Sequence, residues 1–156
     1  MKKIKIHIRN NHWKEGFLPC DAGGEKNNTI TKEEIEKGFD QYPELRDKVE
    51  YLIAWDDDNF VSSMQSADIL LGWQFPTQDL KQIAPNLKWI HVISAGVNHL
   101  SPFDWINKDL VLTNSSGVHA KKAGEFGLMS ILMLQNHMTR IVTNQKNKEF
   151  VSLLGK

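Results

Sequence analysis

Five short apolar runs, each of strand length, alternate along the chain with segments of helical pattern. In the first run, Ile4, Ile6 and Ile8 alternate with polar residues, which is the two-residue period of a β-strand. The other runs cover residues 51–55 (YLIAW), 69–73 (ILLGW), 87–94 (LKWIHVIS) and 110–114 (LVLTN). Because parallel strands must be joined through a crossover, usually a helix, this order predicts an α/β fold. We expect a flavodoxin-like parallel sheet of five strands with helices on both faces.

Helical signals fill the intervals between these runs. Thr31 precedes Glu34 by three residues, the spacing of a capping box, and Ile35 and Phe39 would form the apolar face of a short helix that ends at Pro43. Further helices are expected over residues 60–67 and 77–84. Residues 10–28 contain adjacent glycines and a proline, so a long irregular loop is expected there.

The last expected helix is a long C-terminal one, from about residue 119 to 146. Between residues 126 and 134, large apolar side chains surround almost the whole helix, so this segment needs cover on more than one side. Because a single domain offers only one side, we expect a homodimer that either pairs these helices or exchanges the whole C-terminal helix between two chains. Apolar or small residues also form a regular stripe along the helix: Ala120, Ala123, Gly127, Ile131, Leu134, Met138 and Ile141.

Composition excludes several classes of partner. The 156 residues suffice for one domain with a substantial core, and 19 basic against 19 acidic residues leave no net charge. We therefore expect no nucleic-acid partner and no membrane partner, since both favour a basic excess. Cys20 is the only cysteine, which excludes an intrachain disulfide and fits a reducing cytoplasm. The sequence contains neither a signal peptide nor the ~20 apolar residues of a membrane span.

The loop Ser94-Ala95-Gly96-Val97 is the leading candidate for a binding site. It follows a buried strand, at the carboxyl edge where open α/β sheets bind ligands. Small side chains leave successive backbone N–H groups accessible, and a glycine permits positive φ or a close backbone approach, which together suit a carboxylate. The alternative is an ordinary turn after a strand, where glycine is common.

Aromatic residues follow the preceding strand and would lie beside that loop. Trp73 and Phe75 have the character of pocket walls around a small acid. The alternative is ordinary packing of aromatic side chains at a strand end. Residues 114–119 (NSSGVH) form a polar cap with a turn glycine before the last helix.

Acidic and histidine residues give no metal site. Asp56, Asp57 and Asp58 follow the second strand, as acids that bind Mg²⁺ or accept a phosphoryl group do in receiver domains. The other acids and the lysine of such a site are absent from the ends of the neighbouring strands, which favours a solvated turn. The six histidines have no spacing typical of metal ligands.

Residues 87–134 (LKWIHVISAGVNHLSPFDWINKDLVLTNSSGVHAKKAGEFGLMSILML) resemble the stretch of D-2-hydroxyacid dehydrogenases that leads from the substrate-binding domain into the nucleotide-binding domain. The resemblance is strong over about residues 85–149, and before them only the order of strands and helices agrees. It implies a substrate-binding domain over residues 1–118 and a long interdomain helix over residues 119–148. The nucleotide-binding domain is absent from the chain.

The resemblance also implies roles for residues on the substrate side. In the family, the loop that corresponds to Ser94–Val97 holds the substrate carboxylate through backbone N–H groups. Asn98 departs from the pattern, because the family often has an aspartate there. Trp73 and Phe75 are similar to the wall of the family's substrate pocket.

On the cofactor side, Asn114 and Gly117 match the family's N-x-x-G-V motif, which approaches NAD or NADP. Glu125 matches the acid of an A-E pair, with Gly124 in place of the alanine. Lys122 stands where many relatives have a threonine that contacts the dinucleotide, so the lysine puts that contact in doubt.

The function that the resemblance implies is the substrate-binding portion of an NAD- or NADP-dependent oxidoreductase acting on small 2-hydroxy or 2-keto acids. The family's catalytic arginine, histidine and acid would lie beyond residue 156, and no Gly-x-Gly-x-x-Gly pattern occurs in the chain. We therefore expect no catalytic residue in this chain and no dehydrogenase activity from it alone. The alternative is a stand-alone flavodoxin-like binding or interaction module without catalysis, which the fold alone does not distinguish.

Overall fold

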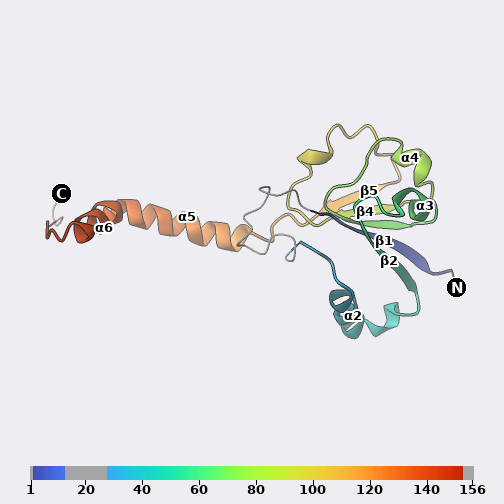
Figure 1. The fold of residues 1–156 in the computed structure, drawn as a ribbon, viewed down its shortest axis with the longest axis horizontal. Helices are drawn as coiled ribbons and strands as arrows, with labels where there is room; N and C mark the ends of the chain where they lie inside the picture. The colour runs from blue at the N-terminus through green and yellow to red at the C-terminus, as the bar shows by residue number, and fades with distance from the viewer. Residues whose placement is uncertain (1, 13–27, 153–156) are drawn as a thin grey trace. The chain divides into compact units, whose positions relative to one another are not determined.

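The structure is a computed structural model that describes residues 2–12 and 28–152 (Figure 1). The chain divides into two compact units, Met1–Ser116 and Gly117–Lys156. The first unit contains a β-sheet with its helices, and the second contains two helices. Most of the loop expected over residues 10–28 lies outside the described residues.

The first unit is built on a parallel sheet of five strands in the order β2-β1-β3-β4-β5. This is the flavodoxin-like strand order, so the predicted α/β fold is confirmed. The chain crosses from β1 to β2 in one direction and returns past β1 to β3, which makes the carboxyl ends of β1 and β3 the switch point of the sheet. The strands are Ile4–Asn10 (β1), Val49–Trp55 (β2), Ile69–Gly72 (β3), Trp89–Val92 (β4) and Val111–Asn114 (β5).

Short helices cover both faces of this sheet, as expected (Figure 1). Helix α2 lies on one face, where the ring of Phe39 contacts that of Tyr51 at 6.1 Å between centroids. Helices α3 and α4 lie on the other face, where Phe60 packs edge-on against His7. The helices of this unit are Lys32–Gln41 (α2), Phe60–Met64 (α3) and Leu80–Ile83 (α4), with 3₁₀ turns at Pro43–Leu45 (η2) and Asn98–Leu100 (η3).

Helix α2 begins as its sequence predicts. The Thr31 side chain accepts a hydrogen bond from the Glu34 N–H, while the Glu34 carboxylate accepts one from the Thr31 N–H, which completes the capping box. Helices α3 and α4 are shorter than the segments expected from the sequence. Each follows a residue in the left-handed region, Asn59 and Asp79, which fixes where the helix starts.

The hydrophobic core lies between one face of the sheet and the helices α3 and α4 that cover it. Leu70 of β3 and Ile90 of β4 contribute to the core from the sheet, and Phe60 and Met64 contribute from α3. Burial of each such side chain contributes roughly 1.5–3 kcal/mol. The buried set also contains Ala67, Phe75, Leu80, Ala84, Leu87, Val92, Leu100 and Trp105.

The second unit contains helices α5 (Ala120–Gln135) and α6 (Met138–Lys146). The single helix expected over residues 119–148 is therefore interrupted. His137 has a φ of 52°, in the left-handed region, and the Asn136 side chain donates to the Leu132 carbonyl at 2.8 Å, which ends α5. No residue of α5 or α6 is buried. In the described ranges 2–12 and 28–152, no helix has the length and apolar character needed to cross a membrane.

Candidate functional site

The candidate loop Ser94–Val97 lies at the carboxyl end of β4, beside the end of β5. Its backbone carbonyl groups are all engaged. The Ser94 carbonyl accepts from the Ser115 N–H at 3.0 Å, and the Ala95 carbonyl accepts from the Asn114 side-chain amide at 3.1 Å. The Gly96 carbonyl accepts from the Ser94 hydroxyl at 2.6 Å. The acceptors of this loop are therefore occupied within the protein.

The backbone N–H groups of the same loop, in contrast, are not engaged within the described part of the protein. Within the part of the chain that the structure describes, the N–H groups of Ala95, Gly96 and Val97 form no hydrogen bond. Ala95 and Gly96 are exposed and Val97 is partly buried. Consecutive free donors on a loop whose acceptors are satisfied form a local positive potential, which favours an anion with several acceptor oxygens.

Gly96 leaves this donor row open. A Cβ atom added at Gly96 would meet nothing within 4 Å, and its φ lies outside the left-handed region. Of the two roles considered for this glycine, positive φ is therefore wrong. What the missing side chain provides is open space beside the N–H groups, into which a ligand can approach the backbone.

The aromatic residues of the neighbouring loop have different surroundings. The Trp73 ring stacks on His99 with 5.0 Å between centroids, and His99 Nε2 donates to the Trp73 carbonyl at 2.7 Å. Because a carbonyl only accepts, Nε2 of His99 carries a proton in this contact. Phe75 instead lies in the core, 4% exposed, with its ring edge-on to Trp105. Trp73 can therefore form a wall beside the candidate loop, whereas Phe75 belongs to the hydrophobic core.

Arg9 holds this aromatic loop in place. Its guanidinium group, at the end of β1, is buried and donates to the Gln74 carbonyl and, at 3.0 Å, to the Asp57 carboxylate. Burial and, secondly, the charge of Arg9 lower the pKa of the neighbouring His7 to about 4, so His7 is neutral at pH 7. Sequence reasoning missed Arg9 and His99, because their roles depend on contacts between distant segments.

The residues expected on the cofactor side are divided between the two units. Asn114 joins loops of the first unit, since its side chain donates to Ala95 and accepts from the Ser116 N–H at 3.1 Å. Gly117 begins the second unit with a φ of +94°, a conformation that favours glycine. Lys122, on α5, is 86% exposed and lies 3.6 Å from Glu125. Its ammonium group is therefore accessible to an anion.

Two of the three aspartates after β2, Asp56 and Asp57, are engaged with basic side chains. Asp56 pairs with His12 at 2.6 Å, and the His12 ring stacks on Trp55. Burial would raise the pKa of Asp56, but the hydrogen bonds and charge of His12 outweigh it and hold this pKa below its ordinary value. In the two described ranges, no cluster of three or more histidine, cysteine or acidic residues is arranged to hold a metal ion.

Comparison with known proteins gives one structural relationship. No family model and no curated protein matches the chain. The fold is similar to the crystal structure of a D-isomer specific 2-hydroxyacid dehydrogenase family protein from Klebsiella pneumoniae 342, with a TM-score of 0.53 and 20% sequence identity. This chain therefore shares the fold of the matched part of that protein. The similarity covers 97% of this chain and 40% of that one, so the chain spans less than half the length of the dehydrogenase.

Proposed function

We propose that this chain is the substrate-binding portion of an NAD(P)-dependent D-2-hydroxyacid dehydrogenase that acts on small 2-hydroxy or 2-keto acids. The observation that carries the proposal is the row of free N–H groups at Ala95, Gly96 and Val97, whose loop has its carbonyl groups already engaged. A substrate carboxylate has the charge and the acceptor oxygens for this row. The shared fold with a member of the dehydrogenase family supports the assignment.

In this proposal, the chain binds and orients the acid. The carboxylate accepts from the N–H row, and each such charge-assisted hydrogen bond contributes about 1.5–3 kcal/mol. Trp73, held by His99, forms the wall beside the substrate's carbon chain. A wall fixed by both stacking and a hydrogen bond limits the size of the acid, since a larger side chain would have to displace the ring.

The dinucleotide would be bound mainly outside these 156 residues. Lys122 has a charge that suits an anionic cofactor, and Asn114 and Gly117 lie close to it in sequence. However, both ends of the Asn114 amide are already engaged, and the chain has no Gly-x-Gly-x-x-Gly loop to hold a pyrophosphate. The residues present do not form a dinucleotide cradle by themselves, so no step of hydride transfer is assigned to them.

The test is a titration of the ¹⁵N-labelled chain with glyoxylate or hydroxypyruvate, followed by amide chemical shifts. We expect the largest shifts at Ala95, Gly96 and Val97. Gly96→Val should weaken binding roughly tenfold or more, since a β-branched side chain fills the open space and costs at least one charge-assisted hydrogen bond. Gly38→Val is the matched control, because a Cβ at Gly38 also meets nothing within 4 Å but lies in helix α2.

Two results would contradict the assignment. One is shifts that fall elsewhere on the sheet, and the other is a Gly96→Val affinity within about twofold of that of the parent chain, a difference of less than ~0.5 kcal/mol. A separate assay follows NADH and NADPH absorbance with the same acids. We expect the chain alone to bind the acid without turnover. Binding of neither acid would favour an interaction module instead.

A further inference from the structure

Polar side chains gather on the face of β4 and β5 that points away from the core. In the parallel register of these strands, Trp89 pairs with Val111 and His91 pairs with Thr113. Successive side chains of a strand point to opposite faces, and Ile90 belongs to the core, so these four residues point away from it. Trp89 is 41% exposed, while His91 and Thr113 are partly buried. This face therefore brings an indole, a hydroxyl and an imidazole group together.

These groups form a chain of hydrogen bonds that runs along the strands to their carboxyl ends. Trp89 Nε1 donates to Thr113 Oγ1 at 2.8 Å. The same oxygen lies 2.9 Å from His91 Nδ1. The other ring nitrogen, His91 Nε2, lies 3.4 Å from the hydroxyl oxygen of Ser115, the first residue after β5. The chain of hydrogen bonds therefore ends at the carboxyl edge of the sheet.

The direction of each hydrogen bond follows from the first donor. An indole N–H only donates, so Thr113 Oγ1 accepts from Trp89 and gives its own hydrogen to another group. Two acceptors lie within reach, His91 Nδ1 at 2.9 Å and the Ile90 carbonyl at 3.4 Å, and the shorter contact is the stronger one. With Nδ1 as the acceptor, the neutral His91 ring carries its proton on Nε2. Because this N–H donates to Ser115 Oγ, the hydrogen of the Ser115 hydroxyl points away from the ring.

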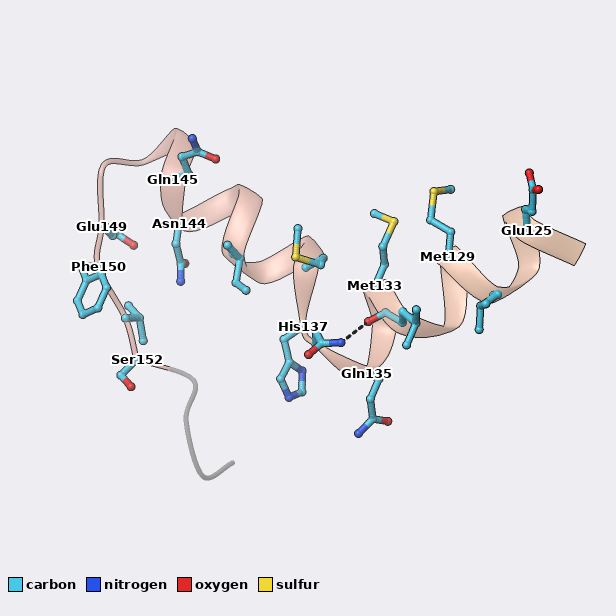
Figure 2. A pocket seen from close by; sticks show the side chains of 16 residues that line it. Glu125, Met129, Met133, Gln135, His137, Asn144, Gln145, Glu149, Phe150 and Ser152 are labelled. Atoms are coloured by element: carbon cyan, nitrogen blue, oxygen red, sulfur yellow. Dashed lines mark hydrogen bonds between the residues drawn. The ribbon is translucent and has the colours of Figure 1, made fainter. Parts of the chain in front are cut away.

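Other polar side chains use their hydrogens within the protein. In the second unit, the Asn136 amide donates to the Leu132 carbonyl at 2.8 Å, which is the dashed line in Figure 2. At the edge of the sheet, the Ser94 hydroxyl donates to the Gly96 carbonyl at 2.6 Å. The one contact of the Ser115 hydroxyl among the described residues is instead with an imidazole N–H, which donates to it. The hydrogen of Ser115 is therefore available to a ligand.

Ser115 lies next to the row of N–H groups that form no hydrogen bond. Its backbone N–H donates to the Ser94 carbonyl at 3.0 Å, which places it beside the start of the loop Ser94–Val97. The preceding residue, Asn114, binds the same loop through the Ala95 carbonyl. Ser115 is partly buried, so it is held by its neighbours and still reaches solvent. The edge of the sheet therefore offers an oriented hydroxyl donor beside the backbone N–H row.

We propose that the Ser115 hydroxyl donates to the substrate carboxylate beside the N–H row. In this arrangement Trp89, Thr113 and His91 are positioning residues that orient the hydrogen of Ser115. The inference rests on the proposed function, because it assigns a further contact to the same acid. A carboxylate has lone pairs for about four donors, so it can accept from the hydroxyl as well as from the row. A donor that is oriented before the acid binds adds affinity, because less conformational entropy is lost on binding.

Titration of the full ¹⁵N-labelled chain with glyoxylate tests the contact. Ser115→Ala should weaken binding about tenfold, since one hydrogen bond to a charged group is lost, while the amide shifts at residues 95–97 remain. Ser115→Thr keeps the hydroxyl and should bind within about twofold of the parent chain. Ser116→Ala is the matched control, because Ser116 is the adjacent, exposed serine and its side chain has no hydrogen bond among the described residues.

A double-mutant cycle tests the positioning. Thr113→Val keeps the shape of the side chain but removes the hydroxyl between Trp89 and His91, so acid binding should weaken about threefold. In a chain that already carries Ser115→Ala, the same change should leave the affinity unaltered. Thr113→Ser restores the hydroxyl and should restore the affinity of the parent chain. Equal losses from Thr113→Val in both backgrounds would mean that Thr113 is merely structural and would overturn its positioning role.

A third measurement needs no variant. The ¹⁵N shifts of the His91 ring at about pH 8, where histidine is ordinarily neutral, distinguish the two tautomers. We expect the proton on Nε2, and a proton on Nδ1 would overturn the orientation of Ser115. A Ser115→Ala chain that binds glyoxylate as the parent does, with the shifts at residues 95–97 intact, would overturn this inference alone. A parent chain without those shifts would overturn the proposed function together with it.

Discussion

Gly72 is the position where a single added methyl group tests the packing of the sheet most directly. It ends β3 and pairs with Arg9 of β1, and a Cβ at this position would lie 2.8 Å from the Arg9 carbonyl oxygen and 3.4 Å from the Arg9 Cβ. The obstacle is the backbone of a central strand, which cannot rotate away as a flexible side chain would. Gly72→Ala must therefore move β1 and β3 apart at their carboxyl ends.

The expected cost follows from two opposing effects. Adding a methyl group to a well-packed interior costs about 1–3 kcal/mol. Replacing glycine also reduces the conformational entropy of the unfolded chain, which returns about 0.4–1 kcal/mol. Gly72→Ala should then lower the free energy of unfolding by about 1–2 kcal/mol. Gly38→Ala is the matched control, since its Cβ meets nothing within 4 Å in α2, and it should raise stability by about 0.5–1 kcal/mol.

Urea unfolding followed by tryptophan fluorescence measures both variants. All five tryptophans precede Gly117, so the signal reports the sheet unit without the second unit. With a slope of about 1–3 kcal/mol per molar urea, the Gly72→Ala midpoint should fall by about 0.5–1.5 M, while the Gly38→Ala midpoint rises. If Gly72→Ala matched or exceeded the stability of the parent chain, the strand contact that we describe would be wrong.

Three further changes follow from other contacts of the sheet unit. Thr31→Ala removes the capping box of α2 and should cost about 1 kcal/mol by urea unfolding; an unchanged midpoint would mean that the cap contributes nothing. Trp105→Phe removes the hydrogen bond to the Leu100 carbonyl at 2.9 Å and should cost about 1–2 kcal/mol, whereas a neutral result would imply that water replaces the donor. Folding lowers the pKa of His7 from 6.5 to about 4, because the folded state accommodates only the neutral ring easily. The contribution of neutral His7 to stability is therefore fully present above pH 6.5 and is lost as the pH falls towards 4. Urea midpoints from pH 7 to 4.5 should therefore fall, and His7→Leu should flatten this dependence.

The strands and the first helix could be predicted because their signals are local. Apolar runs such as residues 51–55 and 69–73 are short and bounded by polar residues, so both their type and their order can be read from the sequence. The capping box at Thr31 and Glu34 likewise involves residues three positions apart. Once the strands alternate with helices, the crossover rules restrict the possible topologies, and the observed strand order is one of the two common ones.

The burial of β1 could not be predicted in the same way. The alternation of isoleucine with charged residues is typical of a strand with one polar face, yet His7 and Arg9 are buried while Ile4 is exposed. The cause is the position of β1 in the middle of the sheet, with α3 packed over the polar side of its carboxyl end. Phe60 contacts both residues, through the His7 ring and under the Arg9 guanidinium. Periodicity gives the phase of a strand, but the packing partners decide whether one face or both are buried, and the last four residues of β1 are buried on both.

The interruption between α5 and α6 escaped prediction for a different reason. The apolar stripe continues through Met138 and Ile141, so a periodicity argument extends one helix across residues 136 and 137. The break depends on the Asn136 side chain, which takes the Leu132 carbonyl, and on the left-handed conformation of His137. Such local competition is worth little free energy, and it decides the structure only where packing against other elements does not oppose it.

The carboxyl edge of the sheet offers a physical reason for the anion binding that we propose for a chain without net charge. Side chains there repeatedly take up backbone carbonyl groups: Arg9 binds the carbonyl of Gln74, His99 that of Trp73, and Asn114 that of Ala95. In each contact a side chain occupies a backbone carbonyl group, so no backbone N–H group is used for it. The N–H groups that remain in the loop after β4 therefore face a site with few competing acceptors, and their partial positive charges are not offset locally. In the proposed site, selectivity for a carboxylate over a cation would then come from which backbone groups are already occupied. Asn114→Ala would free the Ala95 carbonyl, so we expect it to weaken acid binding although Asn114 need not touch the acid; unchanged affinity would mean that the N–H row acts independently of its acceptors.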